Sequence, residues 1–221
     1  MRERRLRAVL WDFDGTLVNS EPMWIEHEKQ LLARYGVSWP EEQFKDQIGE
    51  PAATTAQRIS ESCRGLITAA QAYEELHARI CERFAFGEIP FLPGARELLT
   101  DIRANWIPCG MYTASNKRIM TVVATAMPEF ECIVDGDDVQ RPKPDPEGYL
   151  QAMRRMGVTA EEVIIIEDSV PGADAASATG AVVLAVPLLG SPRPAPRRVL
   201  REGGLTGLDF AGLEKIWRGQ W

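Results

Sequence analysis

Five short apolar runs divide this 221-residue chain, and most of the segments between them have the spacing of amphipathic helices. Apolar runs of four or five residues are typical of strands that are buried on both faces of a sheet. Strands that alternate with helices predict an α/β fold, with a doubly wound parallel sheet covered by helices on both faces. Ser115 is the expected N-cap of the helix after the second strand. The expected strands are 8–11, 108–112, 131–134, 163–166 and 181–185, and the expected helices are 94–106, 115–127, 144–156 and 171–179, with a weaker helical signal at 208–217.

The interval 20–91 interrupts this alternation, because it contains helical stretches and no strand-like run. An insertion directly after the first strand, bounded by loop residues where it returns, predicts a second domain on two linkers. We therefore predict a core domain of residues 1–18 and 92–221 and an inserted all-helical cap domain of residues 19–91. The main helical stretches of the interval are 21–35 and 68–86, and its loop signals are 36–40 and 49–51.

Composition excludes several classes of function. The formal net charge of −7 would repel a phosphate backbone, so we expect no nucleic-acid partner. No apolar run approaches the length of a membrane span, and the basic N-terminal residues run directly into the first strand, unlike a signal peptide. Four widely separated cysteines without a Cys-x-x-Cys pair indicate reduced packing residues, so we expect a cytoplasmic protein. We also expect a monomer that meets no membrane. The cysteines are Cys63, Cys81, Cys109 and Cys132.

Two carboxylates, Asp12 and Asp14, follow the first expected strand, and Gly15 comes next. Residues two apart on a strand share a face, so both carboxylates can point into the crevice at the carboxyl end of the sheet. One could attack an electrophile while the other donates or accepts a proton, and together they could bind Mg²⁺. The alternative is that Asp-Gly is only a turn signal.

Two further segments follow strands and carry polar groups. Thr113, Ala114 and Ser115 stand where the second strand turns into a helix, a place where backbone N–H groups can bind an anion. The alternative is an ordinary helix N-cap. Lys143 lies between two prolines that restrict the local backbone, so its ammonium group could be held beside a carboxylate. The alternative there is a solvated lysine in an exposed turn.

The fourth strand ends in an acidic pair, Glu167 and Asp168, which a glycine-bearing turn connects to a helix. Oxygen ligands from two strand ends suit octahedral Mg²⁺, which keeps some of its waters and leaves room for a phosphate. The alternative is that these acidic residues only cap the next helix.

In their order and context these four segments resemble the motifs of the haloacid dehalogenase superfamily. Asp12 and Asp14 match its first motif, Thr113 its second, Lys143 its third, and Glu167 with Asp168 its fourth. The resemblance covers almost the whole chain and implies a Rossmann-like core. A helical cap after the first motif looks like the subgroup that contains β-phosphoglucomutase and small sugar-phosphate phosphatases. The segment 19–22, Asn-Ser-Glu-Pro, also resembles the phosphatases of that subgroup.

The resemblance implies a role for each motif residue. Asp12 would attack phosphorus and form an aspartyl-phosphate, and Asp14 would act as general acid and then as general base. Lys143 would neutralise Asp12 and the phosphoryl group. Thr113, Ala114 and Ser115, together with Lys143, would bind the phosphate. Mg²⁺ would be held by Asp12, the backbone carbonyl of Asp14 and Asp168, with Glu167 as a ligand or as a residue behind the ligands.

The expected reaction is the Mg²⁺-dependent hydrolysis of a small phosphorylated metabolite, a sugar or polyol monophosphate. The alternative is a β-phosphoglucomutase-type phosphomutase, which would resemble the chain in all four motifs. Where that mutase has a cap histidine this chain has Trp24, and in the cap loop where the mutase binds its second phosphate the chain has Glu50. Both differences favour the phosphatase.

Other members of the superfamily fit the chain less well. A dehalogenase would lack Asp14. A phosphonoacetaldehyde hydrolase would need a reactive cap lysine, and neither Lys29 nor Lys45 lies in an apolar run. A binding module without catalysis would need a defective motif, and every motif position here is filled.

Overall fold

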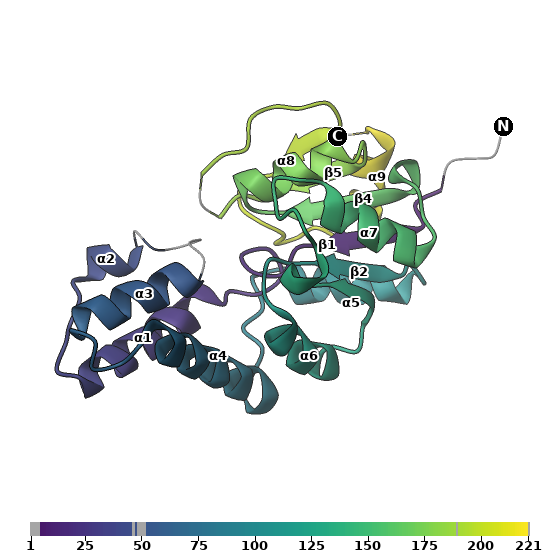
Figure 1. Ribbon diagram of the computed structural model, residues 1–221. Helices are drawn as coiled ribbons and strands as arrows, with labels where there is room; N and C mark the ends of the chain where they lie inside the picture. The colour runs from purple at the N-terminus through teal and green to yellow at the C-terminus, as the bar shows by residue number, and fades with distance from the viewer. Residues whose placement is uncertain (1–4, 46, 48–51, 189, 221) are drawn as a thin grey trace. The chain divides into compact units, whose positions relative to one another are not determined.

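The computed structural model describes residues 5–45, 47, 52–188 and 190–220. The chain divides into two compact units. The first contains the parallel sheet with its helices, and in the described residues of the second the only regular secondary structure is helical (Figure 1). Unit 1 is Met1–Asn19 with Ile89–Trp221, and unit 2 is Ser20–Glu88.

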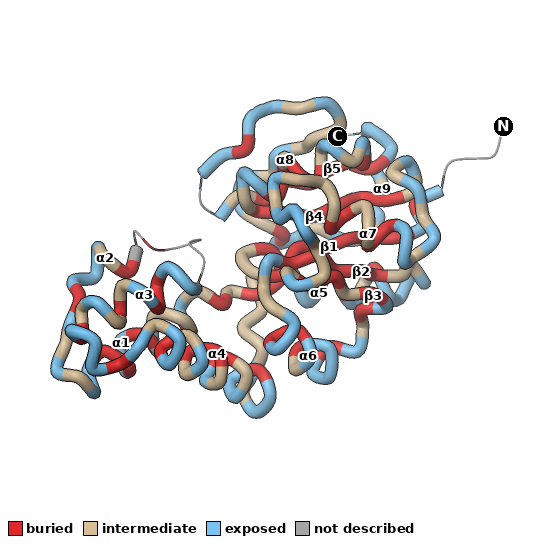
Figure 2. Tube along the Cα trace, in the orientation of Figure 1, coloured by how far each residue is buried: buried red, intermediate tan, exposed pale blue. Residues whose placement is uncertain are grey.

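The sheet of unit 1 is parallel and has the strand order β3-β2-β1-β4-β5-β6, which confirms the predicted α/β class. The apolar runs form its five longer strands, and the inner ones are buried along their whole length (Figure 2). The sixth strand was not predicted. The strands are β1 Ala8–Trp11, β2 Cys109–Tyr112, β3 Phe130–Val134, β4 Val163–Glu167, β5 Val182–Ala185 and β6 Arg198–Leu200.

Helices cover both faces of this sheet, because right-handed crossovers that run outward from β1 in the two opposite directions place their helices on opposite faces. α7 and α8 pack on one face, over alternate strand residues that include Leu10, Tyr112 and Ile165. α5 packs against β2 and contacts α9. The helices of unit 1 are α5 Ala95–Ala104, α6 Lys117–Ala126, α7 Glu147–Met156, α8 Val170–Ala178 and α9 Phe210–Arg218, with short 3₁₀ turns at Gly136–Asp138 and Ala160–Glu162.

Unit 2 has its own apolar core, around Leu32, Ile59 and Leu76. Trp39 belongs to this core, and its indole N–H donates to the Ser62 hydroxyl (3.0 Å), so it is a packing residue. None of the helices in the described part of the chain is long and apolar enough to cross a membrane. The helices of unit 2 are α1 Glu21–Arg34, α2 Glu41–Lys45, α3 Ala52–Ser62 and α4 Ala69–Phe86.

Candidate active site

The candidate site lies where the strand order of the sheet reverses. The chain adds β2 and β3 on one side of β1, and then β4, β5 and β6 on the other, so a crevice opens at the carboxyl ends of β1 and β4. Asp12 directly follows β1, and its backbone N–H donates to the carbonyl of Ile166 in β4 (3.0 Å). Asp168 directly follows β4. The topology therefore brings the carboxylates of two distant segments to one place.

The loop after β1 approaches the end of β4 very closely. Gly15 has a φ of 87°, and a Cβ atom at this position would collide with the carboxylate of Asp168. The next residue, Thr16, donates from its hydroxyl to Oδ1 of Asp168 (3.0 Å). A glycine and a hydroxyl at these two positions thus fix the Asp168 side chain.

Glu167 is completely buried, and both of its carboxylate oxygens are hydrogen-bonded. Oε1 accepts from Nζ of Lys143 (2.5 Å) and from the hydroxyl of Tyr149 (3.3 Å). Oε2 accepts from the backbone N–H and the hydroxyl of Ser169 (2.8 and 3.0 Å). A Cβ atom on Gly172 would overlap this carboxylate, so a glycine is required there. These contacts favour a role for Glu167 behind the metal ligands.

Lys143 joins the two strand ends. Its buried ammonium group donates to Oδ1 of Asp12 and to Oε1 of Glu167, each at 2.5 Å. Since Asp168 also belongs to the cluster, one cation faces three carboxylates. The ionised cluster therefore has a net charge of −2.

The net negative charge of this cluster shifts the pKa values of its members. Burial raises the pKa of the Asp12 carboxyl well above its ordinary value, and Glu167 and Asp168 add to the rise while Lys143 opposes it. Burial likewise raises the pKa of Asp168 to about 6, again with a contribution from Glu167. Burial alone would lower the pKa of Lys143, but Asp12 and Glu167 outweigh it and raise that pKa well above its ordinary value.

Asp14 is turned toward the segment after β2. Its Oδ2 accepts from the hydroxyl of Ser115 (2.7 Å) and from that of Thr113 (3.3 Å). The prediction that Ser115 is the N-cap of α6 is wrong. The N-cap is Asn116, whose side chain accepts from the backbone N–H of Ile119 (3.1 Å), which leaves the Ser115 hydroxyl available to Asp14.

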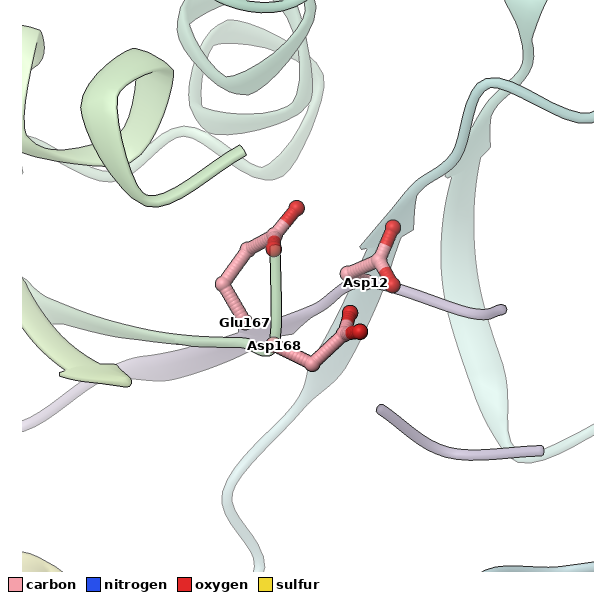
Figure 3. Close-up of side chains that lie close together, drawn as sticks. All are labelled: Asp12, Glu167 and Asp168. Carbon is pink, nitrogen blue, oxygen red and sulfur yellow. The ribbon is translucent and has the colours of Figure 1, made fainter. Parts of the chain in front are cut away.

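The donor set fits a magnesium ion. Carboxylate oxygens of Asp12, Glu167 and Asp168 lie within 4.8 Å of one another (Figure 3). Oδ2 of Asp12 is buried and has no hydrogen-bond partner, although a buried charged oxygen without a partner is costly. Hard oxygen ligands and a net charge of −2 are what a divalent cation such as Mg²⁺ requires. Figure 3 also shows Glu167 and Asp168 leaving the end of β4 in different directions.

Sequence reasoning missed three residues of the site: Thr16, Tyr149 and Ser169. Thr16 and Ser169 stand next to motif residues and could have been found there. Tyr149 could not, because in the sequence it is an ordinary buried position of a helix. The roles given to the motif residues, including phosphate binding by Ala114, stay predictions.

The cap residues that distinguish a phosphatase from a phosphomutase or a phosphonoacetaldehyde hydrolase belong to unit 2. Trp24 packs edge-on against the ring of His77, with 5.2 Å between ring centroids. Lys29 pairs with Glu41 (2.5 Å) at the surface. Residues 48–51, which include Glu50, and the side chain of Lys45 lie outside the described part of the chain.

Two curated relatives and one solved structure are similar to the chain over most of its length. The validoxylamine A 7'-phosphate phosphatase of Streptomyces hygroscopicus subsp. limoneus is 30% identical over 180 residues, which are 79% of this chain and 82% of that protein. The phosphorylated carbohydrates phosphatase of Thermotoga maritima is 28% identical over 193 residues, with the same coverage. The structure of CbbY from Rhodobacter sphaeroides in complex with phosphate has a TM-score of 0.77 at 24% identity, and the match covers 95% of this chain and 99% of that one.

Another relative is much longer. The bifunctional riboflavin kinase/FMN phosphatase of Arabidopsis thaliana is 29% identical over 192 residues, and the match spans only 48% of that protein. The family model of haloacid dehalogenase-like hydrolases matches residues 9–186, a range that contains all four motifs. The chain therefore belongs to the haloacid dehalogenase-like hydrolase family.

Proposed function

We propose that the chain is a Mg²⁺-dependent phosphatase that hydrolyses a sugar or polyol monophosphate through an aspartyl-phosphate on Asp12. At the level of enzyme class, relatives named as phosphatases confirm the prediction of a phosphoric monoester hydrolase. The preference for a sugar or polyol rests on relatives named as phosphatases of phosphorylated carbohydrates and of hexitols.

One observation carries the proposed mechanism. Asp12 is a buried carboxylate with one oxygen held by Lys143 and the other without a partner. This arrangement leaves an oxygen for a metal or for an electrophile, while the ammonium group reduces repulsion between the carboxylate and an incoming phosphate. When bound, Mg²⁺ would stabilise charge on the phosphoryl oxygens, with Asp12, Asp168 and the Asp14 carbonyl as its ligands.

The first step forms the covalent intermediate. An oxygen of Asp12 attacks phosphorus, and the bond between phosphorus and the leaving alcohol breaks. The carboxyl of Asp14, in its protonated form, gives its proton to the alcohol oxygen. Thr113 and Ser115 already contact Asp14, so these hydroxyls hold the acid beside the proposed phosphate site.

The second step releases phosphate. The Asp14 carboxylate takes a proton from water, the resulting hydroxide attacks phosphorus, and the Asp12 carboxylate leaves. Unit 2 would act as the cap that excludes bulk water and selects the leaving group. A cytoplasmic location and a monomeric state stay predictions.

Phosphate release from a panel of sugar and polyol monophosphates tests the proposal. We expect Mg²⁺-dependent release of one phosphate per substrate, with no need for a bisphosphate. Isomerisation of β-glucose 1-phosphate to glucose 6-phosphate, stimulated by glucose 1,6-bisphosphate and faster than phosphate release, would instead support the phosphomutase. Full activity in EDTA would contradict the metal assignment.

A further inference from the structure

A buried tyrosine contacts the lysine–carboxylate cluster from a helix and not from a strand end. Tyr149, in the first turn of α7, is completely buried, and its hydroxyl donates to Oε1 of Glu167 (3.3 Å). The same oxygen accepts from Nζ of Lys143 (2.5 Å). A neutral hydroxyl and a charged ammonium group therefore share one carboxylate oxygen.

The rings of two tyrosines enclose the same ammonium group. Nζ of Lys143 lies 5.0 Å from the ring centroid of Tyr112 and 5.4 Å from that of Tyr149. The two rings pack edge to face, 5.0 Å apart. Contact with an aromatic face stabilises a cation, but it has no preference for one carboxylate over another. What decides the position of the ammonium group is the balance between Asp12 and Glu167.

Glu167 competes with Asp12 for Lys143, because the ammonium group donates to both at the same distance. A second donor on Oε1 of Glu167 partly satisfies that oxygen and weakens its attraction for the ammonium group. In a buried site this difference is not screened by water. Without the Tyr149 hydroxyl, Oε1 would attract Lys143 more strongly and Asp12 would lose part of its counter-charge.

We propose that Tyr149 is a positioning residue. Its hydroxyl weakens the attraction of Glu167 for Lys143, so that the ammonium group stays hydrogen-bonded to Asp12. The inference rests on the proposed function, in which Lys143 neutralises Asp12 and the phosphoryl group. Tyr149 itself does not touch the substrate in this account. It acts through Glu167 and Lys143.

The test is Tyr149→Phe, which keeps the buried ring and removes the hydroxyl. With p-nitrophenyl phosphate and Mg²⁺ we expect kcat/KM to fall about 10- to 100-fold, as for other residues that support a metal-site carboxylate, with most of the loss in kcat. Tyr35→Phe, at the end of α1 in unit 2, is the matched control and should change kcat/KM less than about twofold. Unchanged kinetics in Tyr149→Phe would overturn the inference.

A double-mutant cycle separates positioning from packing. In a Glu167→Gln background the competing charge is gone, so adding Tyr149→Phe should change kcat/KM less than about twofold. If the tyrosine hydroxyl matters only for packing, the same fold-loss would occur in both backgrounds, and that result would overturn the inference.

A spectroscopic measurement does not depend on turnover. The NMR signals of the Lys143 side chain, assigned by their loss in Lys143→Arg, should shift in Tyr149→Phe but not when that change is added to Glu167→Gln. An inactive wild-type protein with this pattern of shifts would contradict the proposed function and leave the positioning role supported. Lys143 signals that do not respond to Tyr149→Phe would refute the positioning role even in an active enzyme.

Discussion

Mg²⁺ binding should weaken as the pH falls through about 6, because Asp168 has to lose its proton before it can bind a metal. Burial raises the pKa of this carboxyl to about 6, the charge of Glu167 adds to the rise, and the hydrogen bond from Thr16 opposes it. A raised carboxyl pKa means that the protonated form persists to a higher pH. The affinity for the cation should therefore rise with pH across this range and not fall.

The size of the effect follows from the fraction of Asp168 that is ionised. With a pKa of about 6 this fraction drops from about nine-tenths at pH 7 to about one-tenth at pH 5, and the apparent affinity falls in proportion, by about tenfold. The pKa of Asp12 is also raised, well above its ordinary value. Asp12 also has to be ionised to bind the cation, so its raised pKa acts in the same direction.

Isothermal titration calorimetry at pH 5, 6 and 7 measures this dependence directly. Buffers of different ionisation enthalpy report the protons that are released when Mg²⁺ binds. Asp168→Asn should bind Mg²⁺ at least about tenfold more weakly. Its Mg²⁺ affinity should also lose the part of the pH dependence that comes from the titration of Asp168. Glu28→Gln is the matched control, because it removes a different carboxyl with a raised pKa, in unit 2, and should leave the pH dependence unchanged. An affinity that stays constant from pH 5 to pH 7 would refute the reasoning.

Three further predictions concern single carboxylates. Asp12→Asn should abolish turnover while the protein stays folded, since a neutral amide of nearly the same shape cannot attack phosphorus; substantial activity of a purified, folded variant would exclude the covalent route. Asp14→Asn should keep its Mg²⁺ affinity but lose on the order of 10²- to 10⁴-fold in rate, and a calorimetric loss of affinity would give this residue another role. Burial, with the nearby Glu21, raises the pKa of Glu28 to about 7. The folded protein therefore prefers Glu28 in its protonated form, so the stability that this side chain allows is fully present below its unfolded pKa and is lost as the pH rises through 7. Glu28→Gln should therefore be more stable than the wild type at pH 8, by up to about 3 kcal/mol in urea unfolding, and nearly equal to it at pH 4; an equal difference at both pH values would contradict this.

The sequence predicts the inner strands well because a strand buried on both faces needs a continuous apolar run. Each of the five expected strands differs from the observed one by at most one residue at either end. The apolar pattern does not predict β6, because this strand is three residues long and begins with an arginine. The strand forms because Arg198 donates to Asp174, Ser177 and two backbone carbonyls, and because β5 offers an edge to pair with. These are tertiary contacts, and they leave no local signal.

The convergence of the motif carboxylates at one sheet edge follows from the topology alone. The direction of each side chain does not. Glu167 and Asp168 are neighbours in the sequence, yet Glu167 turns toward Lys143 and Tyr149 while Asp168 turns toward Thr16. Space left by Gly172 and a donor from a distant helix decide this difference, and neither can be read from the spacing of the motifs.

The most direct test of the central claim is to look for phosphate on Asp12 during turnover. A phosphorylated substrate that the enzyme hydrolyses would be mixed with an excess of enzyme and Mg²⁺ and quenched in acid within a single turnover. Borohydride reduces an acyl phosphate to an alcohol, so peptide mass spectrometry can locate the modified residue. The account predicts a transient phosphoryl group on Asp12 that disappears as inorganic phosphate is released. Complete release of phosphate without any modification of Asp12 at any time during the turnover would contradict it.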